Sequence, residues 1–140
     1  MPLLFTAHSL PQRILADGDP YVAQLEASVA GVLARLGLES RRGRFAFQSA
    51  GRTPEPWLGP DASAVLEELA AAGERRVLLC PIGFVSDHLE VLYDVDVEYQ
   101  ELAGRLGLHL ERSESLNAGP LVIGALADLV RSSARERGWI

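Results

Sequence analysis

The part of the sequence most suited to chemistry is an acidic run that begins at Asp87. It reads Asp-His-Leu-Glu-Val-Leu-Tyr-Asp-Val-Asp-Val-Glu-Tyr-Gln-Glu, with apolar residues between the acids. On a helix with about 100° per residue, five carboxylates fall within an arc of about 80°, namely Asp87, Glu90, Asp94, Glu98 and Glu101. Carboxylate oxygens bind divalent cations and exchange protons. The run therefore predicts an acidic stripe that handles metal ions or protons.

The carboxylates of this stripe repel one another. Like charges four residues apart destabilise a helix by about 0.2–0.5 kcal/mol per pair, and Glu90, Asp94 and Glu98 form two such pairs. No lysine or arginine lies on the same predicted face, so metal ions or shared protons would have to supply the compensating charge. Glu90 and Glu98 lie about 12 Å apart along a helix axis, which favours a path over a single site.

A simpler interpretation treats the same acids as a helix start followed by a solvated face. Asp87 would be the N-cap and Glu90 its partner in a capping box, and runs of like charge are usually solvated. On the pattern alone this interpretation is the more common one. It does not explain why His88 lies between the capping pair, or why the rest of the helix is so apolar.

His8 is the second candidate, because it follows the short apolar run from Pro2 to Ala7. Such a run predicts a buried strand, with His8 at its carboxyl end. A histidine there could be a ligand or a base, since sheets of this class bind ligands at that edge, or simply a hydrogen-bonded structural group. Spacing does not decide between them. His109 alternates with leucines and is predicted to lie on the surface.

Four short apolar runs alternate with four helical patterns along the chain. Asp19 is the predicted N-cap of the first helix and Asn117, or a near neighbour, that of the last. Prolines and glycines predict a long loop over 50–60. The predicted strands are 2–7, 44–49, 76–82 and 108–111, and the predicted helices are 21–36, 61–72, 87–105 and 120–134.

This alternation predicts the fold class. Right-handed crossovers would give an α/β fold, with an open, mainly parallel four-stranded sheet and helices on both faces, Rossmann-like in kind. Ligands bind such sheets beyond the carboxyl ends of the strands. The length of 140 residues, with 48% hydrophobic and 23% charged residues, predicts one domain over 1–140.

Composition excludes several classes of function. A net charge of −6 leaves no positive surplus for phosphates, so we expect no nucleic-acid partner. No stretch approaches the roughly 20 apolar residues of a transmembrane helix, and no secretion leader is evident, so we expect a cytoplasmic protein. Cys80 is the only cysteine, which rules out a disulfide framework within the chain and predicts a core thiol.

Three segments together resemble the ferrochelatases, enzymes that insert ferrous iron into a porphyrin in heme biosynthesis. The resemblance covers most of the chain in the family's order. The segments are Phe-Thr-Ala-His-Ser-Leu-Pro from residue 5 with Gly-Asp-Pro-Tyr from 18, Gln-Ser from 48 with Pro-Trp-Leu-Gly-Pro from 56, and Pro-Ile-Gly-Phe-Val-Ser-Asp-His-Leu-Glu-Val-Leu-Tyr-Asp from 81.

The resemblance implies roles for individual residues. His8 corresponds to the active-site histidine, a metal ligand or acceptor of a pyrrole proton, and Glu90 to the carboxylate facing it. A neutral imidazole, with an ordinary pKa of about 6.5, is a suitable base near neutral pH. Asp94 and Glu98 match outer acids where a second divalent ion such as Mg²⁺ can bind. Residues lining or near the porphyrin pocket correspond to Tyr21, Trp57, Phe84 and His88.

The resemblance also suggests the branch of the family. The stretch from Gln48 to Trp57 is closest to bacterial enzymes that act on coproporphyrin III. The chain lacks a cysteine-rich tail, which agrees with a member without an iron–sulfur cluster. The predicted enzyme is a lyase whose metal substrate is Fe²⁺.

Ferrochelatases contain two similar α/β domains with the porphyrin between them, and this sequence resembles the C-terminal one. We therefore expect one of three arrangements. The chain is the C-terminal half of a split or truncated enzyme, forms a homodimer as single-domain cobalt chelatases do, or is a non-catalytic porphyrin- or metal-binding half-domain that needs a partner chain. A generic α/β ligand-binding domain would leave the joint occurrence of the three segments unexplained.

Overall fold

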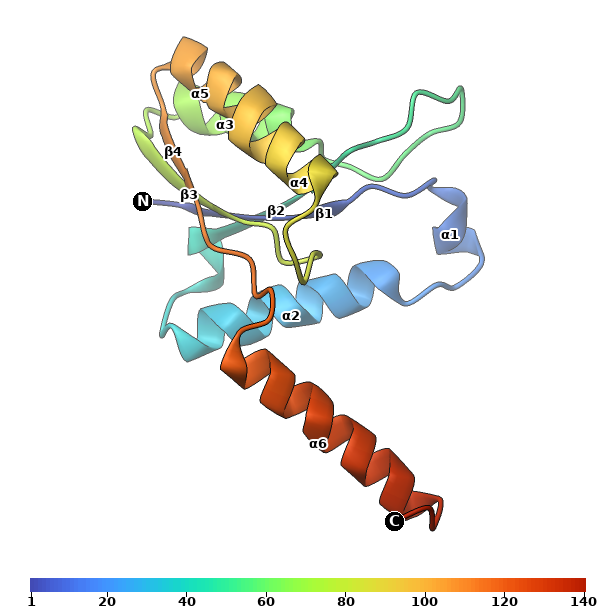
Figure 1. Ribbon diagram of the computed structural model, residues 1–140. Coiled ribbons are helices and arrows are strands. Elements are labelled where there is room, and N and C mark those ends of the chain that lie inside the picture. The colour runs from blue at the N-terminus through green and yellow to red at the C-terminus, as the bar shows by residue number, and fades with distance from the viewer.

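The computed structural model describes all residues from 1 to 140 and contains one parallel sheet (Figure 1). Its strands are β1 (Leu3–His8), β2 (Gly43–Gln48), β3 (Arg76–Cys80) and β4 (His109–Arg112). They are arranged in the order β2-β1-β3-β4, and every neighbouring pair is parallel. The predicted open, parallel, four-stranded sheet is confirmed.

Helices cover both faces of this sheet, as predicted. In Figure 1, α3 (Ala62–Ala71) and the run α4 (Leu89–Tyr93), η2 (Asp94–Tyr99) and α5 (Gln100–Leu106) lie on one side, and α2 (Tyr21–Arg35) lies on the other. Two short elements were not predicted, α1 (Arg13–Ala16) and the 3-10 turn η1 (Ser40–Arg42). The last helix, α6 (Pro120–Glu136), projects away from the body.

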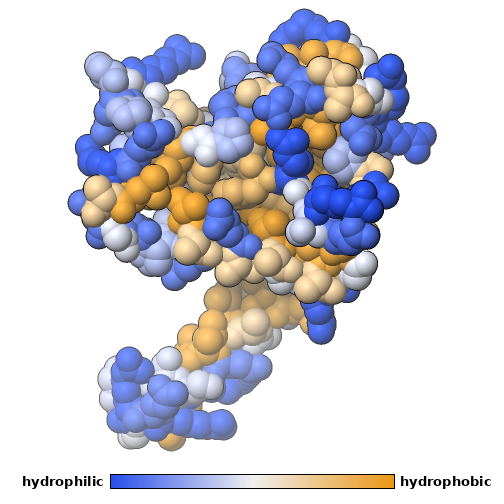
Figure 2. Space-filling model, turned by 180° about the vertical axis from the view of Figure 1, so that it is seen from behind, coloured by the Kyte–Doolittle hydropathy of each residue, from blue (hydrophilic) through white to orange (hydrophobic).

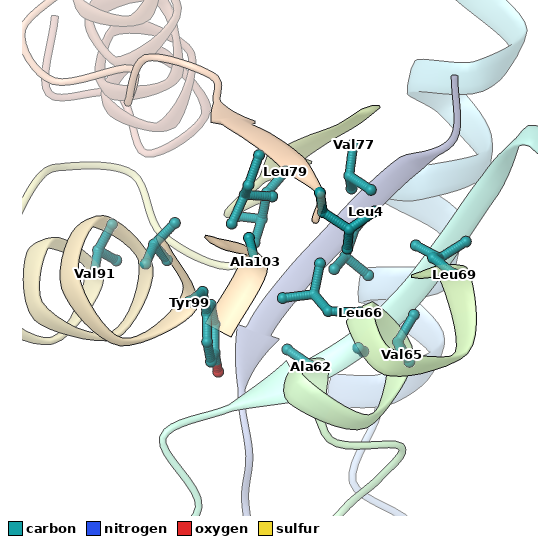
Figure 3. Packing of buried hydrophobic residues seen from close by; sticks show 14 residues of the cluster. Leu4, Ala62, Val65, Leu66, Leu69, Val77, Leu79, Val91, Tyr99 and Ala103 are labelled. Carbon is teal, nitrogen blue, oxygen red and sulfur yellow. The ribbon is translucent and has the colours of Figure 1, made fainter. Parts of the chain in front are cut away.

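The larger core lies between the sheet and the α3, α4 and α5 side. It contains 14 buried residues, including Leu4 and Leu79 of the central strands (Figure 3). A smaller cluster on the opposite face joins Phe5 of β1 to Leu33 of α2. Because both faces are covered, β1 is buried from Leu3 to Ala7, as continuous apolar strands of parallel sheets usually are.

The predicted regular helix over 87–105 is wrong in one respect, because its middle third, η2, is a π-helix. Along the whole run from α4 to α5, the buried residues are spaced by four, namely Val91, Val95, Tyr99 and Ala103. In an α-helix, a spacing of four drifts by about 40° at each step. The wider π turn counteracts this drift, so the four side chains remain on the face toward the core.

Some of the predicted helix starts also need correction. His88, not Asp87, is the N-cap of α4, and it makes no side-chain cap bond, so no capping box joins Asp87 to Glu90. The start of α6 agrees with the prediction of a cap at or near Asn117, since the N-cap residue is Gly119. The predicted N-cap of α2, Asp19, is off by one position, because the N-cap residue is Pro20. The Asp19 carboxylate still accepts a hydrogen bond from the Tyr21 N–H at 2.8 Å.

No residue of α6 is buried. Most of its hydrophobic side chains are instead exposed, and Figure 2 shows hydrophobic groups along the helix where it leaves the body. The most exposed members are Leu121, Ile123, Leu126, Leu129 and Val130. None of the helices has the length and apolar character needed to cross a membrane.

Candidate active site

His8 lies at the carboxyl end of β1, as predicted, and its ring orientation is set by a backbone carbonyl. The Nδ1 atom of His8 is hydrogen-bonded to the carbonyl oxygen of Ser9. A carbonyl can only accept, so in the neutral ring Nδ1 carries the hydrogen and the Nε2 lone pair is free. That Nε2 atom lies 3.6 Å from Oε2 of Glu90.

The backbone around His8 is held by three neighbouring segments. The Tyr21 hydroxyl donates to the His8 carbonyl at 2.9 Å, and burial raises the pKa of this phenol, so it remains a donor. The Ser9 N–H donates to the Gln48 carbonyl at 2.7 Å, and the Ser9 hydroxyl donates to the Leu58 carbonyl at 2.8 Å. Tyr21 therefore supports the strand end that carries His8.

The segment after β3 passes unusually close to β1. A Cβ atom on Gly83 would lie 2.5 Å from the Cβ of Ala7, and the Gly83 N–H donates to the Thr6 carbonyl at 3.1 Å. Only glycine fits this approach. The same segment carries Phe84 and His88, whose rings meet edge to face at a centroid distance of 5.0 Å.

Glu90 reaches the site from the first turn of α4. Its side chain is 53% exposed and that of His8 is 31% exposed, so the pair is open to solvent. The separation of 3.6 Å is longer than a hydrogen bond, but it is short enough for an ion pair when the imidazole is protonated. A proton or a metal ion between these two groups would be neutralised by the carboxylate.

Asp94 and Glu98 form the second pair of predicted metal residues. They line a polar cleft of about 320 Å³. Asp94 is half-buried, contacts the Ser49 hydroxyl, and accepts a long 3.5 Å bond from the Gln48 amide. The other residues around the cleft include Ala50, Arg52, Asp61, Ser63, Tyr93 and Tyr99. The structure therefore brings Asp94 and Glu98 to one cleft.

Tyr99 reports the electrostatic character of this cleft. Its pKa is raised far above the ordinary value, first by burial and then by the charges of Asp61, Asp94 and Glu98. A negative field favours the neutral phenol over the phenolate, so Tyr99 keeps its proton. The same field would favour a bound divalent cation.

The predicted metal residues occur as two pairs rather than one ligand cluster. His8 faces Glu90, while Asp94 and Glu98 share the polar cleft. Nowhere in the structure do three or more His, Cys, Asp or Glu side chains come together as a group able to hold an ion. This arrangement is compatible with successive positions along a path and does not form a preassembled multidentate site.

Trp57 lies in the loop that crosses the segment after His8. Its backbone forms an antiparallel bridge with Pro11, and its indole N–H donates to the Thr53 hydroxyl at 2.8 Å. The ring covers Gly51, where a Cβ would lie 2.3 Å from the indole. Trp57 therefore fixes the loop beside the site.

The compensating cation that the acidic run seemed to lack is partly present, and the sequence pattern did not reveal it. Arg112 of β4 forms ion pairs with Asp87 at 3.1 Å and with Asp96 at 2.8 Å. Arg112 lies 16 residues after Asp96 and 25 after Asp87 in the sequence, so no helical periodicity connects it to them. Neither Asp94 nor Glu98 has an ion-pair partner among the described contacts, and Glu90 has only His8.

The ferrochelatase family profile matches residues 1–134. The chain belongs to the ferrochelatase family. It is 52% identical over 128 residues to the ferrochelatase of Herpetosiphon aurantiacus, covering 91% of this chain and 41% of that protein. It is 46% identical over 134 residues to the ferrochelatase of Deinococcus radiodurans, covering 96% of this chain and 42% of the relative.

The mitochondrial ferrochelatase of Bos taurus is also similar, with 44% identity over 137 residues, 96% of this chain and 32% of that protein. The chain thus spans about two fifths of the bacterial relatives named above. Among solved structures, the putative cobalamin biosynthesis CbiX protein of Marinobacter aquaeolei matches with a TM-score of 0.63 and 12% identity. This match covers 96% of our chain and 98% of that chain, and it supports the chelatase-type fold alone.

Proposed function

We propose that this chain supplies one wall of a ferrochelatase active site, in which Fe²⁺ is inserted into a porphyrin for heme biosynthesis. The observation that carries the proposal is the placement of His8 Nε2 at 3.6 Å from the Glu90 carboxylate, at the carboxyl end of the central strand. Ligands of open parallel sheets bind at this edge. Membership of the ferrochelatase family supplies the reaction class.

The reaction exchanges two pyrrole protons and the water ligands of Fe²⁺ for four iron–nitrogen bonds. The free Nε2 lone pair of His8 accepts a proton from a pyrrole N–H or binds the arriving ion. Glu90 then stabilises the imidazolium or receives the proton for release to solvent. Its exposure of 53% gives it that access to water.

Asp94 and Glu98 form the outer part of the same path. Their cleft would hold a divalent cation such as Mg²⁺ or deliver Fe²⁺ toward Glu90, because oxygen ligands suit both ions. Support for this proposal comes from the shared cleft and from the field that raises the pKa of Tyr99. Phe84, His88, Tyr21 and Trp57 would form this chain's part of the porphyrin pocket.

We propose coproporphyrin III as the porphyrin, from the resemblance of residues 48–57 to the bacterial branch. This choice is separable from the reaction itself. Parallel assays with coproporphyrin III and protoporphyrin IX test it directly. We expect a higher kcat/KM with coproporphyrin III, and a preference for protoporphyrin IX would contradict the assignment.

The opposite wall of the pocket would come from residues outside these 140, such as an N-terminal half, or from a second copy of the chain. Two observations support this part of the proposal. The Glu90 side chain is exposed and that of His8 is partly exposed, and the chain spans 41% of the Herpetosiphon relative. The same openness favours a second candidate function, a non-catalytic porphyrin- or metal-binding half-domain that needs a partner chain.

The test measures loss of free-base coproporphyrin fluorescence after addition of Fe²⁺ or Zn²⁺. It uses the purified chain alone and the chain mixed with the N-terminal domain of the Herpetosiphon relative, and the mass in solution is measured for both. We expect turnover in the complete assembly, abolished by His8→Ala and retained by His109→Ala, whose histidine is exposed and paired with Glu111. Porphyrin binding without turnover in both samples would favour the half-domain function. No binding in either would overturn the proposal.

A further inference from the structure

Arg112, the last residue of β4, lies between two carboxylates of the acidic run. Its Nε and Nη2 donate to the two oxygens of Asp96 at 2.8 and 2.9 Å, and its Nη1 donates to Asp87 at 3.1 Å. The Arg112 side chain is only 16% exposed. A guanidinium that makes a two-point contact fixes orientation as well as distance. Arg112 therefore fastens the acidic run to the sheet at two places.

A closed set of hydrogen bonds surrounds the Asp87 end of this connection. Asp87 accepts from the Ser115 hydroxyl at 2.7 Å and from the Asn117 amide at 2.9 Å, and its own N–H donates to the Asn117 side chain at 2.9 Å. The Asn117 N–H also donates to the Val85 carbonyl at 2.9 Å. The turn before α4 is thus held by the segment that follows β4.

Glu90 lies between the two fastened positions, three residues after Asp87 and six before Asp96. Its exposed carboxylate has no ion-pair partner except His8, at 3.6 Å. Contacts of its own side chain therefore do little to fix its place. The position of Glu90 depends on the backbone of α4, and that backbone is bounded by the two anchors of Arg112.

We propose that Arg112 is a positioning residue that holds the Glu90 carboxylate opposite His8 by anchoring both ends of the segment that carries it. The inference rests on the proposed role of His8 and Glu90 in metal handling. Lysine would keep the charge of Arg112 but lose the planar two-point contact with Asp96. The conservative substitution Arg112→Lys is therefore the informative one.

The first test measures Zn²⁺ affinity by calorimetry for the full chain and for the variants Arg112→Lys, Glu90→Gln and the two combined. We expect Arg112→Lys to weaken binding by about 10- to 100-fold, the usual effect of losing a group that orients a metal ligand. The combined variant should bind no more weakly than Glu90→Gln alone, because Arg112 acts through Glu90. Arg44 lies on the opposite edge strand, β2, and contacts Glu68 of α3 at 2.6 Å, so Arg44→Lys should leave the affinity unchanged.

An Arg112→Lys effect that is equally large in the Glu90→Gln background would overturn the proposal, because Arg112 would then act through the fold in general. Unchanged Zn²⁺ affinity in Arg112→Lys would overturn it as well. These outcomes leave the proposed reaction intact, since they concern only how Glu90 is held.

The second test is independent of metal binding and uses amide hydrogen exchange. In Arg112→Lys we expect faster exchange in α4 and η2, with unchanged protection in β1 and β3. If the unmodified chain binds no Zn²⁺, the proposed metal role fails, and this exchange pattern still decides the positioning role. Unchanged protection of the α4 amides would overturn it.

Discussion

At the residue scale, the chemistry of His8 depends on a neighbouring carbonyl group. The Ser9 carbonyl selects the ring hydrogen on Nδ1 and leaves the Nε2 lone pair directed toward Glu90. Ser9 is itself buried and tied to the Leu58 carbonyl. A metal ligand or base needs both features, a defined tautomer and a fixed ring, and short-range contacts around β1 provide them.

The outer acids give a prediction about metal binding. We expect Asp94→Asn combined with Glu98→Gln to weaken binding of divalent cations more strongly than binding of porphyrin, because the polar cleft loses two of its carboxylates. Calorimetry with Mg²⁺ and Zn²⁺, and fluorescence titration with coproporphyrin, measure the two effects.

A matched control for this pair is Asp17→Asn combined with Glu26→Gln, which removes the same charge from exposed positions outside the cleft. The control should leave the cation affinity unchanged. Equal losses of cation and porphyrin binding, or no loss of cation binding, would contradict a path along the acidic helix.

Asp87 gives a prediction about pH. Hydrogen bonds from Asn117 and Ser115, with the charge of Arg112, hold its pKa below the ordinary value of 3.8. A carboxylate whose pKa is lowered by folding stabilises the fold above its unfolded pKa, and this contribution is lost as pH falls through the folded pKa. Asp87→Asn should therefore lower the free energy of unfolding near neutral pH.

Urea unfolding at a series of pH values measures this effect. The difference between the unmodified chain and Asp87→Asn should shrink as the pH falls below 3.8, the ordinary pKa of the group. A difference that is constant with pH would mean that the ionised form of Asp87 contributes nothing to stability. Asp17→Asn, on an exposed carboxylate without a described partner, serves as the control.

Sequence alone could place some of these residues and not others. The apolar run before His8 was enough to predict a strand end there, and the structure confirms that position. The role of Arg112 could not be predicted, because its partners Asp87 and Asp96 lie in the turn before α4 and in η2 and are recognisable only once β4 pairs with β3. Contacts of this kind depend on tertiary structure and leave no periodic signal.

At the scale of elements, the π segment shows where the prediction of a regular helix failed. Periodicity correctly indicated a helix over most of 87–105, but a pattern search at 3.6 residues per turn cannot distinguish a local π turn. The signal was present in the sequence, because Val91, Val95 and Tyr99 are spaced by four residues. All three side chains are buried. The same register keeps Asp94 and Glu98 at one cleft.

The approach of the Gly83 segment to β1 gives a prediction about stability. We expect Gly83→Ala to destabilise the fold by about 1–3 kcal/mol, as other insertions into packed regions do, because the new Cβ would lie 2.5 Å from the Ala7 Cβ. The displaced segment carries Phe84 and His88, so proposed porphyrin affinity should fall as well. Urea unfolding and porphyrin fluorescence measure the two effects.

Gly104→Ala is the matched control for this substitution. Gly104 lies in α5, and a Cβ there would meet no atom within 4 Å. Alanine at such a position should stabilise the helix by about 0.4–1 kcal/mol. Equal stability of the two alanine variants would contradict the close approach between Gly83 and Ala7.

At the scale of the whole molecule, the order β2-β1-β3-β4 places the site at the centre of the sheet. His8 ends the central strand β1, and the segment after β3 reaches over to it through the Gly83 contact. The fold class was predictable because strand and helix patterns alternate and parallel crossovers have a fixed hand. The pattern of α6 by itself did not predict the exposure of this helix, because its apolar stripe is typical of a helix packed on a core.

The exposed stripe of α6 gives the last prediction. Side chains such as Leu126 and Val130 are 53% and 69% exposed, and burying one of this kind contributes about 1.5–3 kcal/mol. A stripe of this kind favours contact with the polypeptide that completes the proposed cleft or with a second copy of the chain. We therefore expect Leu126→Glu combined with Val130→Glu to weaken that association by about 100-fold or more, given two lost side chains of this size.

Sedimentation of the chain, alone and with the N-terminal domain of the Herpetosiphon relative, measures this association over a concentration series. Because α6 contains no buried residue, the substitutions should leave the midpoint of thermal unfolding of the isolated chain unchanged. Arg131→Glu changes the net charge by the same amount at an exposed position away from the stripe, and it should preserve association. Association that survives the stripe substitutions would place the interface elsewhere on the molecule, and α6 would then be a solvated extension of the fold.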